Sequence, residues 1–114
     1  MASDPSAAAV PQTAPVTITS ADGQRAVLDF RGALDAHMVR ELEERFADPR
    51  LTEARTWVLN MHNLTRIDLA CAYALLRAAT MRPDPVAITV RGARRNVHRT
   101  LREVAFDAVA AFQD

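Results

Sequence analysis

The pattern of apolar and polar residues predicts a buried strand followed by a long helix in the middle of the chain. Residues 57–61 form a short apolar run with an aromatic and a β-branched side chain, typical of a strand, and a polar break follows at residues 62–63. Residues 69–81 contain neither Gly nor Pro and repeat apolar residues at helical spacing, so they predict a mostly apolar helix. The inner side of this helix is expected to carry Leu69, Ala72, Tyr73, Leu75, Leu76 and Ala79.

Asp68 stands between this strand and this helix. Its position predicts a helix cap, in which the carboxylate accepts hydrogen bonds from the free amides of the first helical turn. Because exposed turns carry function more often than buried elements do, we expect function to lie at this turn.

The residues before this unit predict a hairpin and one amphipathic helix. Residues 16–19 and 26–30 alternate as strands do, and residues 21–24 contain the Asp-Gly pair of a hairpin turn. Residues 36–47 place apolar side chains on one face and charged side chains on the other, and Asp35 is expected to cap this helix. The hairpin is therefore expected to begin a sheet.

The residues after the central helix predict one more strand and two helices. Residues 86–90 read as a strand, residues 94–104 as a helix, and residues 106–112 as a short closing helix. The resulting order, β-β-α-β-α-β-α-α, predicts an α/β (α+β) fold. Because the later strand-helix-strand steps need crossovers, those strands are expected to be parallel, in a mixed β-sheet with helices mainly on one face.

Composition limits the class of protein. The chain has 114 residues, of which 49% are hydrophobic and 25% charged, as in one globular domain. Its formal net charge of +0 gives no global attraction to nucleic acid or to an anionic membrane. No apolar stretch approaches the roughly 20 residues that span a bilayer, so no membrane insertion is expected and a cytoplasmic location is the default. Residues 1–14 are expected to be a disordered tail, followed by a single domain over residues 15–114.

Little in the chain predicts catalysis, a cofactor or a metal site. His37, His62 and His98 lie on three different predicted elements, with no companion ligands at metal-binding spacing. The sequence has no Gly-rich phosphate loop and no Ser/His/Asp order, so an enzyme is not expected. Cys71 lies near the start of a helix, where a thiol pKa can fall, but a packed small hydrophobe is the favoured interpretation.

Arginine residues gather on the polar side of the last main helix. They are Arg91, Arg94, Arg95, Arg99 and Arg102, with His98 among them. Such a face is able to bind phosphate, nucleic acid or an acidic protein patch. No aromatic residue interleaves the arginines, and all basic residues of the chain are arginine, so a solvated surface is favoured over nucleic-acid binding.

Three stretches resemble, in the same order, the motifs of one known family. Residues 30–35 are similar to a Gly-Glu-Leu-Asp turn before that family's first helix. Residues 57–60 with 64–68 are similar to its central strand and the run into a signature Asp-Ser-Ser/Thr-Gly, and residues 97–101 to a late helix that usually reads Val-x-Arg-x-Leu. The family is the STAS domain, the fold of bacterial anti-sigma factor antagonists, and the likeness covers residues 15–112.

The chain departs from this family within the signature. In phosphorylatable members, the residue after the signature Asp is the Ser or Thr that a partner kinase modifies, whereas Leu69 and Ala70 have no hydroxyl and Cys71 replaces the Gly. The resemblance therefore implies no phosphorylation at the usual position, Leu69. Thr65 is the nearest substitute hydroxyl, and Thr80 is a second one.

The resemblance implies a non-catalytic protein-interaction module of bacterial sigma-factor regulation. Its partner would be an anti-sigma factor of the serine kinase-like ATPase class, bound without the usual phosphorylation switch. The partner-binding residues carried over by motif are Asp35, Asp68, Leu69 and Ala70, with the exposed side of the central helix. Two alternatives stay open: an accessory subunit of an ABC-type membrane transport complex, and a redox or small-ligand sensor that uses Cys71.

Overall fold

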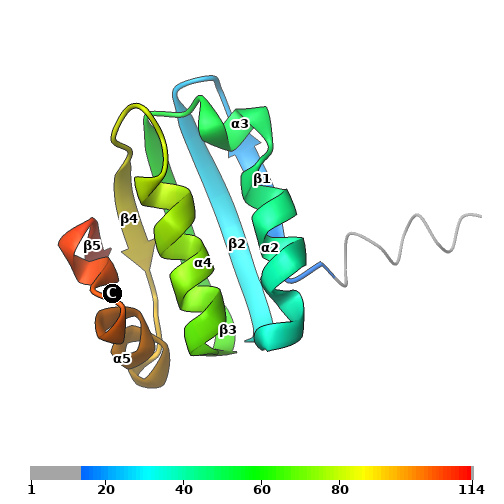
Figure 1. The fold of residues 1–114 in the computed structure, drawn as a ribbon, viewed down its shortest axis with the longest axis vertical. Helices are drawn as coiled ribbons and strands as arrows, with labels where there is room; N and C mark the ends of the chain where they lie inside the picture. The colour runs from blue at the N-terminus through cyan, green and yellow to red at the C-terminus, as the bar shows by residue number, and fades with distance from the viewer. Residues whose placement is uncertain (1–13, 114) are drawn as a thin grey trace, which may run out of the picture.

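The computed structural model describes residues 14–113, which form one five-stranded sheet with helices on one face (Figure 1). The strands, in spatial order, are β1 Val16–Ala21, β2 Arg25–Leu34, β3 Thr56–Ile67, β4 Ala87–Arg91 and β5 Ala110–Gln113. β1 and β2 are antiparallel, and the pairs from β2 to β5 are parallel. The prediction of a mixed sheet that begins with a hairpin is therefore confirmed. The tail expected over residues 1–14 lies, apart from residue 14, outside the described residues.

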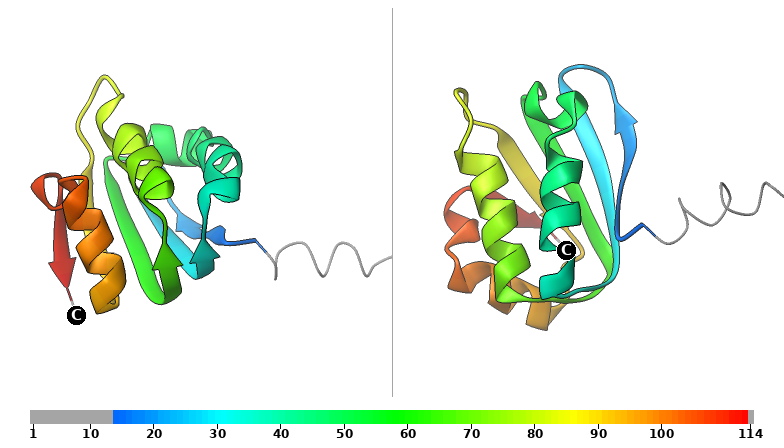
Figure 2. Two further views of the ribbon diagram at one scale, coloured as in Figure 1. Left: turned by 60° about the horizontal axis from the view of Figure 1, so that its bottom comes forward. Right: turned by 45° about the vertical axis from the view of Figure 1, so that its right-hand side comes forward.

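The helices cover a single face of the sheet, with α4 between α2 and α5 (Figure 2). They are η1 Ala36–Met38, α2 Val39–Phe46, α3 Pro49–Thr52, α4 Leu69–Thr80, α5 Arg95–Glu103 and the short η2 Phe106–Ala108. The helix predicted over residues 36–47 thus begins with a 3-10 turn, and α3 is an additional turn that the sequence pattern does not reveal. Within residues 14–113, no helix has both the length and the apolar character needed to cross a bilayer.

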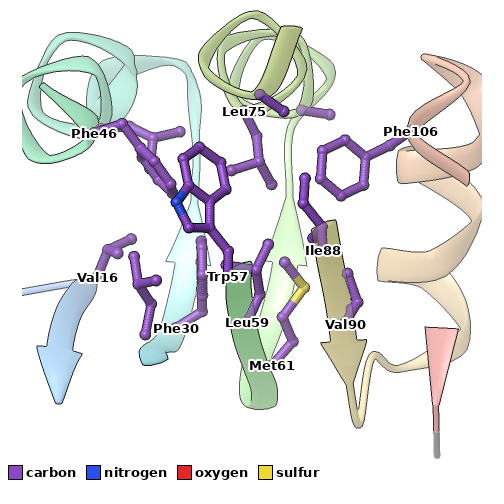
Figure 3. Close-up of a cluster of buried hydrophobic side chains, with 14 of the residues drawn as sticks. Val16, Phe30, Phe46, Trp57, Leu59, Met61, Leu75, Ile88, Val90 and Phe106 are labelled. Carbon is purple, nitrogen blue, oxygen red and sulfur yellow. The ribbon is translucent and has the colours of Figure 1, made fainter. Parts of the chain in front are cut away.

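Trp57 on β3 lies at the centre of the contact between the sheet and the helices (Figure 3). Its ring packs against Phe46 of α2 with the ring centroids 5.0 Å apart, and its Nε1 donates to the carbonyl oxygen of Leu51 at 3.0 Å. The guanidinium of Arg82 lies over the same indole, 5.6 Å from the ring centroid. A buried Trp whose N–H is satisfied combines a large apolar area with a fixed orientation. Trp57 therefore holds β3, α2 and α3 together.

Small side chains bring α4 close to the sheet. Its buried residues are Cys71, Ala72, Ala74, Leu75 and Ala79. Leu75 is fully buried and points into the layer between helix and sheet (Figure 3). Full burial of a leucine side chain contributes about 1.5–3 kcal/mol, so this face fixes the position of α4 and of its first turn.

Contrary to expectation, the strand predicted over residues 57–61 does not end at the polar residues 62–63, because β3 runs without interruption to Ile67. Two bulges on β3 explain the pattern: residues 61 and 62 lie opposite Phe30 of β2, and Thr65 is an extra residue between the next two pairs. Each extra residue resets the two-residue alternation. Met61, Leu64 and Ile67 are thereby buried although they are three residues apart.

The closing helix expected over residues 106–112 is also wrong. Ala105 adopts a left-handed backbone conformation with φ of 63°, which ends the preceding helical segment, and η2 occupies only residues 106–108. The chain then forms β5, which pairs with β4. Phe106 is fully buried, and the ring of Phe112 stacks on His98 with centroids 4.3 Å apart. The spacing of three between Phe106, Val109 and Phe112 fits a short 3-10 turn followed by a strand as well as it fits a helix.

Candidate functional site

Two turns meet at the end of the sheet where β2 and β3 finish and η1 and α4 begin. The amide of Asp68 donates to the carbonyl oxygen of Leu34 at 2.8 Å, which joins the two strand ends. Asp35 caps η1, as expected, because its Oδ1 accepts from the amide of His37 at 3.0 Å. The structure therefore brings Asp35 and Asp68 to one edge of the sheet.

The prediction that the Asp68 carboxylate caps its own helix is wrong. Asp68 occupies the N-cap position of α4, but its side chain makes no capping hydrogen bond there. Its Oδ2 instead accepts from the amide of Ala36, at 3.0 Å, in the neighbouring turn. Its Oδ1 lies 4.0 Å from Nε of Arg66, a loose and exposed ion pair. The signature aspartate thus caps η1 across the site and ties the two turns together.

Cys71, in the first turn of α4, makes a further hydrogen bond between the two turns, on their buried side. Its Sγ donates to the carbonyl oxygen of Asp35 at 3.1 Å, and the side chain is fully buried. Burial raises the pKa of the thiol to about 11, and the negative charges of Asp68 and Asp35 add to the rise. The lower thiol pKa that a position near a helix start allows is therefore not found, because desolvation and the two carboxylates act against the helix dipole, and the burial of Cys71 agrees with the favoured interpretation of a packed small hydrophobe. At neutral pH, Cys71 is a protonated, packed thiol.

The outer side of α4 next to these turns is apolar. Leu69 and Tyr73 are each 45% exposed, and Ala70 beside them is exposed as well. The periodicity of the sequence places Leu69 and Tyr73 on the inner side of the helix, and the structure corrects this. Arg77 is the one charged residue in the sequence of α4. We call Leu69, Ala70 and Tyr73 the α4 patch. Tyr73 is the member that motif resemblance did not identify; the scarcity of charge along residues 69–80 was the available signal.

A groove between α2 and α4 lies at the other end of α4. Its volume is about 310 Å³, and Phe46, Trp57, Ala74, Ala78 and Met81 form its apolar walls. Arg77 and Glu43 form an ion pair at its rim, with 3.0 Å between Nη2 and Oε2. None of the site residues predicted from the sequence lines this groove. The groove and the α4 patch are therefore separate features of the same helix.

The described histidines do not gather into a site. His37 lies on η1, His62 on β3 and His98 on α5. Among residues 14–113, no group of three or more His, Cys, Asp or Glu side chains is arranged to hold a metal ion.

Comparison with known families decides the classification. A profile of the family described as "Mlab, STAS domain" matches residues 18–111. The chain belongs to the STAS domain family. The match spans the sheet from β1 to β5 and confirms the resemblance drawn from the sequence motifs. No sequence of a curated protein matches this chain.

Solved structures of anti-sigma factor antagonists share the fold. SpoIIAA in its unphosphorylated form is 12% identical, with a TM-score of 0.65, over 87% of this chain and 88% of that chain. An anti-sigma factor antagonist from Mycobacterium paratuberculosis is 13% identical, with a TM-score of 0.67, over 85% of this chain and 84% of that chain. Bacillus SpoIIAA in its phosphorylated form is 12% identical, with a TM-score of 0.61, over 87% and 91%. At such identities the likeness establishes the fold.

Proposed function

We propose that this STAS domain is a non-catalytic protein-interaction module that binds its partner through the α4 patch and the turns at Asp35 and Asp68. The observation that carries the proposal is the exposure of Leu69 and Tyr73, each at 45%, beside two turns locked together by hydrogen bonds. Tyrosine at the centre of an apolar surface is typical of the residues that dominate binding energy at protein interfaces. The fixed turns reduce the entropy lost on binding, because little has to be ordered.

The partner that the fold favours is an anti-sigma factor with a serine kinase-like ATPase fold. Support comes from the likeness to anti-sigma factor antagonists, one of which was solved in a phosphorylated and an unphosphorylated form. In this chain Leu69, Ala70 and Cys71 offer no hydroxyl to such a kinase. The module therefore binds without being released by phosphorylation at this turn.

The two substitute hydroxyls are both engaged in hydrogen bonds. Thr65 Oγ1 donates to the carbonyl oxygen of Gly32 at 2.9 Å, and Thr80 Oγ1 donates to that of Leu76 at 2.9 Å. Thr80 ends α4, a full helix length from Asp68. Phosphopeptide mapping after incubation with the cognate kinase and ATP is expected to find no modification of residues 65–80. Robust modification of Thr65 would show instead that the switch has moved along the chain.

A second candidate is an accessory subunit of an ABC-type membrane transport complex. The missing hydroxyl favours it, because an accessory subunit that stays bound needs no phosphoacceptor. The matched family profile is also described by the name Mlab rather than by a sigma-factor role. A sensor that uses Cys71 receives no support, since the thiol is buried and its pKa is raised.

Photo-cross-linking in the native cell separates the two partner classes. A benzoyl-phenylalanine replaces Tyr73 in the patch and, as a control at the opposite end of the sheet, the exposed Gln24 in the turn between β1 and β2. An adduct from position 73 alone that contains an anti-sigma kinase supports the leading proposal, and one that contains a transport ATPase supports the second. Equal adducts from both positions, or none from position 73, would remove the α4 patch from the interface.

A further inference from the structure

The exposed side of α5 carries three arginines and one acidic residue, Glu103, at its last position. Arg95, Arg99 and Arg102 follow one another at i, i+4 and i+7, so they share one side of the helix. Val97 and Leu101 on the opposite side are fully buried in the core. Arg91 at the end of β4 and Arg94 at the N-cap of α5 extend the set beyond the helix. We call these five exposed residues, Arg91, Arg94, Arg95, Arg99 and Arg102, the arginine surface.

The arginine surface is not neutralised by its own chain within residues 14–113. The ion pairs found there join Arg50 to Asp48, Arg66 to Asp68 and Arg77 to Glu43, and none includes a member of the surface. The acidic residues next to it in sequence are Glu103, at the end of α5, and Asp107 in η2. The surface therefore presents guanidinium groups that are free to meet an external partner.

This arrangement works against the stability of α5. Arg94 and Arg95 stand at the positive end of the helix dipole, and the first turn holds no acidic residue. Arg95 and Arg99 are like charges at i and i+4, which repel each other. A helix selected only for solvation would gain by exchanging one of these residues for an acid.

Helix α2 shows that a general excess of arginine does not explain the pattern. Its polar side mixes signs, with Arg40 and Arg45 among Glu41, Glu43 and Glu44. Both helices belong to the same arginine-rich chain, yet α5 has Glu103 as its only acidic residue, whereas α2 has three. This difference favours a role for the arginine surface over a solvated face without function.

Four kinds of anionic partner differ in what they require of the surface that binds them. Insertion into lipid needs exposed apolar side chains, and those of α5 are buried against the sheet. Single-stranded nucleic acid needs aromatic stacking platforms, and the arginine surface has none. Duplex DNA rewards many phosphate contacts, whereas this surface offers five arginines on a chain of formal net charge +0. Carboxylates of a protein suit it, because guanidinium groups bind them in pairs of hydrogen bonds.

We propose that α5 docks an acidic helical segment of another protein, with carboxylates spaced to meet Arg95, Arg99 and Arg102. The seven residue steps from Arg95 to Arg102 span about 10 Å along the helix axis. Glu or Asp residues at i, i+4 and i+7 on a facing helix repeat over the same length. This surface is distinct from the α4 patch, and its occupant does not depend on the function proposed above.

The test uses the whole chain and a synthetic alanine-based helical peptide with Glu at i, i+4 and i+7. In an NMR titration, amide shifts are expected in residues 95–103, with binding that weakens as salt rises from about 50 to about 200 mM. The triple variant Arg95→Gln, Arg99→Gln, Arg102→Gln is expected to lose about tenfold or more in affinity. The matched variant Arg40→Gln, Arg45→Gln on α2 should bind as the wild type does.

Several outcomes would overturn the proposal. They are unchanged peptide affinity in the triple variant, shifts confined to other elements, and tighter binding of a short duplex DNA or of phosphatidylglycerol vesicles at the same ionic strength. A peptide with the same Glu content placed around all sides of the helix should bind more weakly, and equal binding would also contradict it. A melting curve checks folding: the triple variant should melt near the wild-type temperature, because relief of the repulsion between Arg95 and Arg99 is offset by the loss of Arg102, which complements the C-terminal end of the helix dipole.

Discussion

The carboxylate of Asp68 accepts a hydrogen bond from the backbone amide of Ala36, 32 residues earlier in the chain, at 3.0 Å. Asp68 occupies the N-cap position of α4, but its side chain stabilises the start of η1 instead of the start of α4. The bond from Cys71 Sγ to the carbonyl oxygen of Asp35, at 3.1 Å, closes the same junction from the inside. Through these contacts, the two turns that we propose as an interface behave as one rigid unit.

Removal of the Asp68 carboxylate should loosen the start of the other helix. We expect Asp68→Ala to lower the free energy of unfolding by about 1 kcal/mol, as loss of a capping group typically does. Hydrogen exchange at the Ala36 amide should accelerate, because its acceptor is lost. Asp68→Asn keeps an oxygen in place and should retain most of the protection. Urea denaturation and NMR hydrogen exchange measure the two effects.

The control for Asp68 is Glu44→Ala, which removes an exposed carboxylate on α2. It should leave both the stability and the exchange of the Ala36 amide unchanged. If Asp68→Ala instead accelerated exchange in the first turn of α4 and left Ala36 protected, the carboxylate would be capping its own helix in solution.

The sequence reveals the order of the main elements because their apolar periods differ. The alternation of residues 16–19 and 26–30 and the helical spacing of residues 69–81 each fit one type of element. The sequence does not reveal that the Asp68 carboxylate accepts from the amide of Ala36, since these residues are far apart in the chain. The bulges of β3 hide the second half of the strand, residues 62–67, because Met61, Leu64 and Ile67 are spaced as in a helix. The exposure of Leu69 and Tyr73 is likewise invisible to a pattern that assigns apolar residues to the interior.

Gly92 is held close to the ring of His62, in a backbone conformation with φ of +72°. A Cβ at this position would overlap the imidazole and would also occupy the left-handed region. We expect Gly92→Ala to destabilise the fold by about 1–2 kcal/mol through the backbone alone, and further because the His62 ring must move. Thermal and urea unfolding measure the total.

Gly32 separates these two contributions. Its φ is +75°, but a Cβ there would have no other atom within 4 Å, so Gly32→Ala reports the backbone cost alone. In a protein that already carries His62→Ala, the added substitution Gly92→Ala should cost only as much as Gly32→Ala does, because the overlap with the imidazole is gone. Equal effects of Gly92→Ala with and without His62 would show that the ring moves aside freely.

Cys71 should be protected from alkylation at neutral pH. Burial and the nearby carboxylates raise the thiol pKa from 9.0 to about 11, so the folded protein favours the neutral form. This contribution to stability is present below pH 9 and is lost as the pH rises from 9 toward 11. The stability of Cys71→Ala should lack that decline, at an overall cost on the order of 1 kcal/mol. Iodoacetamide kinetics and unfolding curves across this pH range test both points.

The carboxylate contribution to Cys71 has its own variant. Asp68→Asn removes one of the two negative charges that raise the thiol pKa, so the pKa should fall while the burial contribution remains. Alkylation of the wild type at neutral pH as fast as that of free cysteine would contradict the packed-thiol assignment and restore the sensor interpretation.

Ala70 tests the proposed interface directly. It is the second residue of α4 and is exposed, so a carboxylate there complements the helix dipole and should not destabilise the domain. In an interface with an apolar centre, the same carboxylate would be desolvated without a partner, at a cost of several kcal/mol. We therefore expect Ala70→Asp to melt near the wild-type temperature and to lose about a hundredfold in affinity for the physiological partner. Calorimetric titration beside a melting curve measures both.

The control for Ala70→Asp is Ala108→Asp, which adds the same charge to the exposed η2 turn and should bind the partner normally. Undiminished binding by a well-folded Ala70→Asp variant would place the interface elsewhere and leave only the fold in common with anti-sigma factor antagonists.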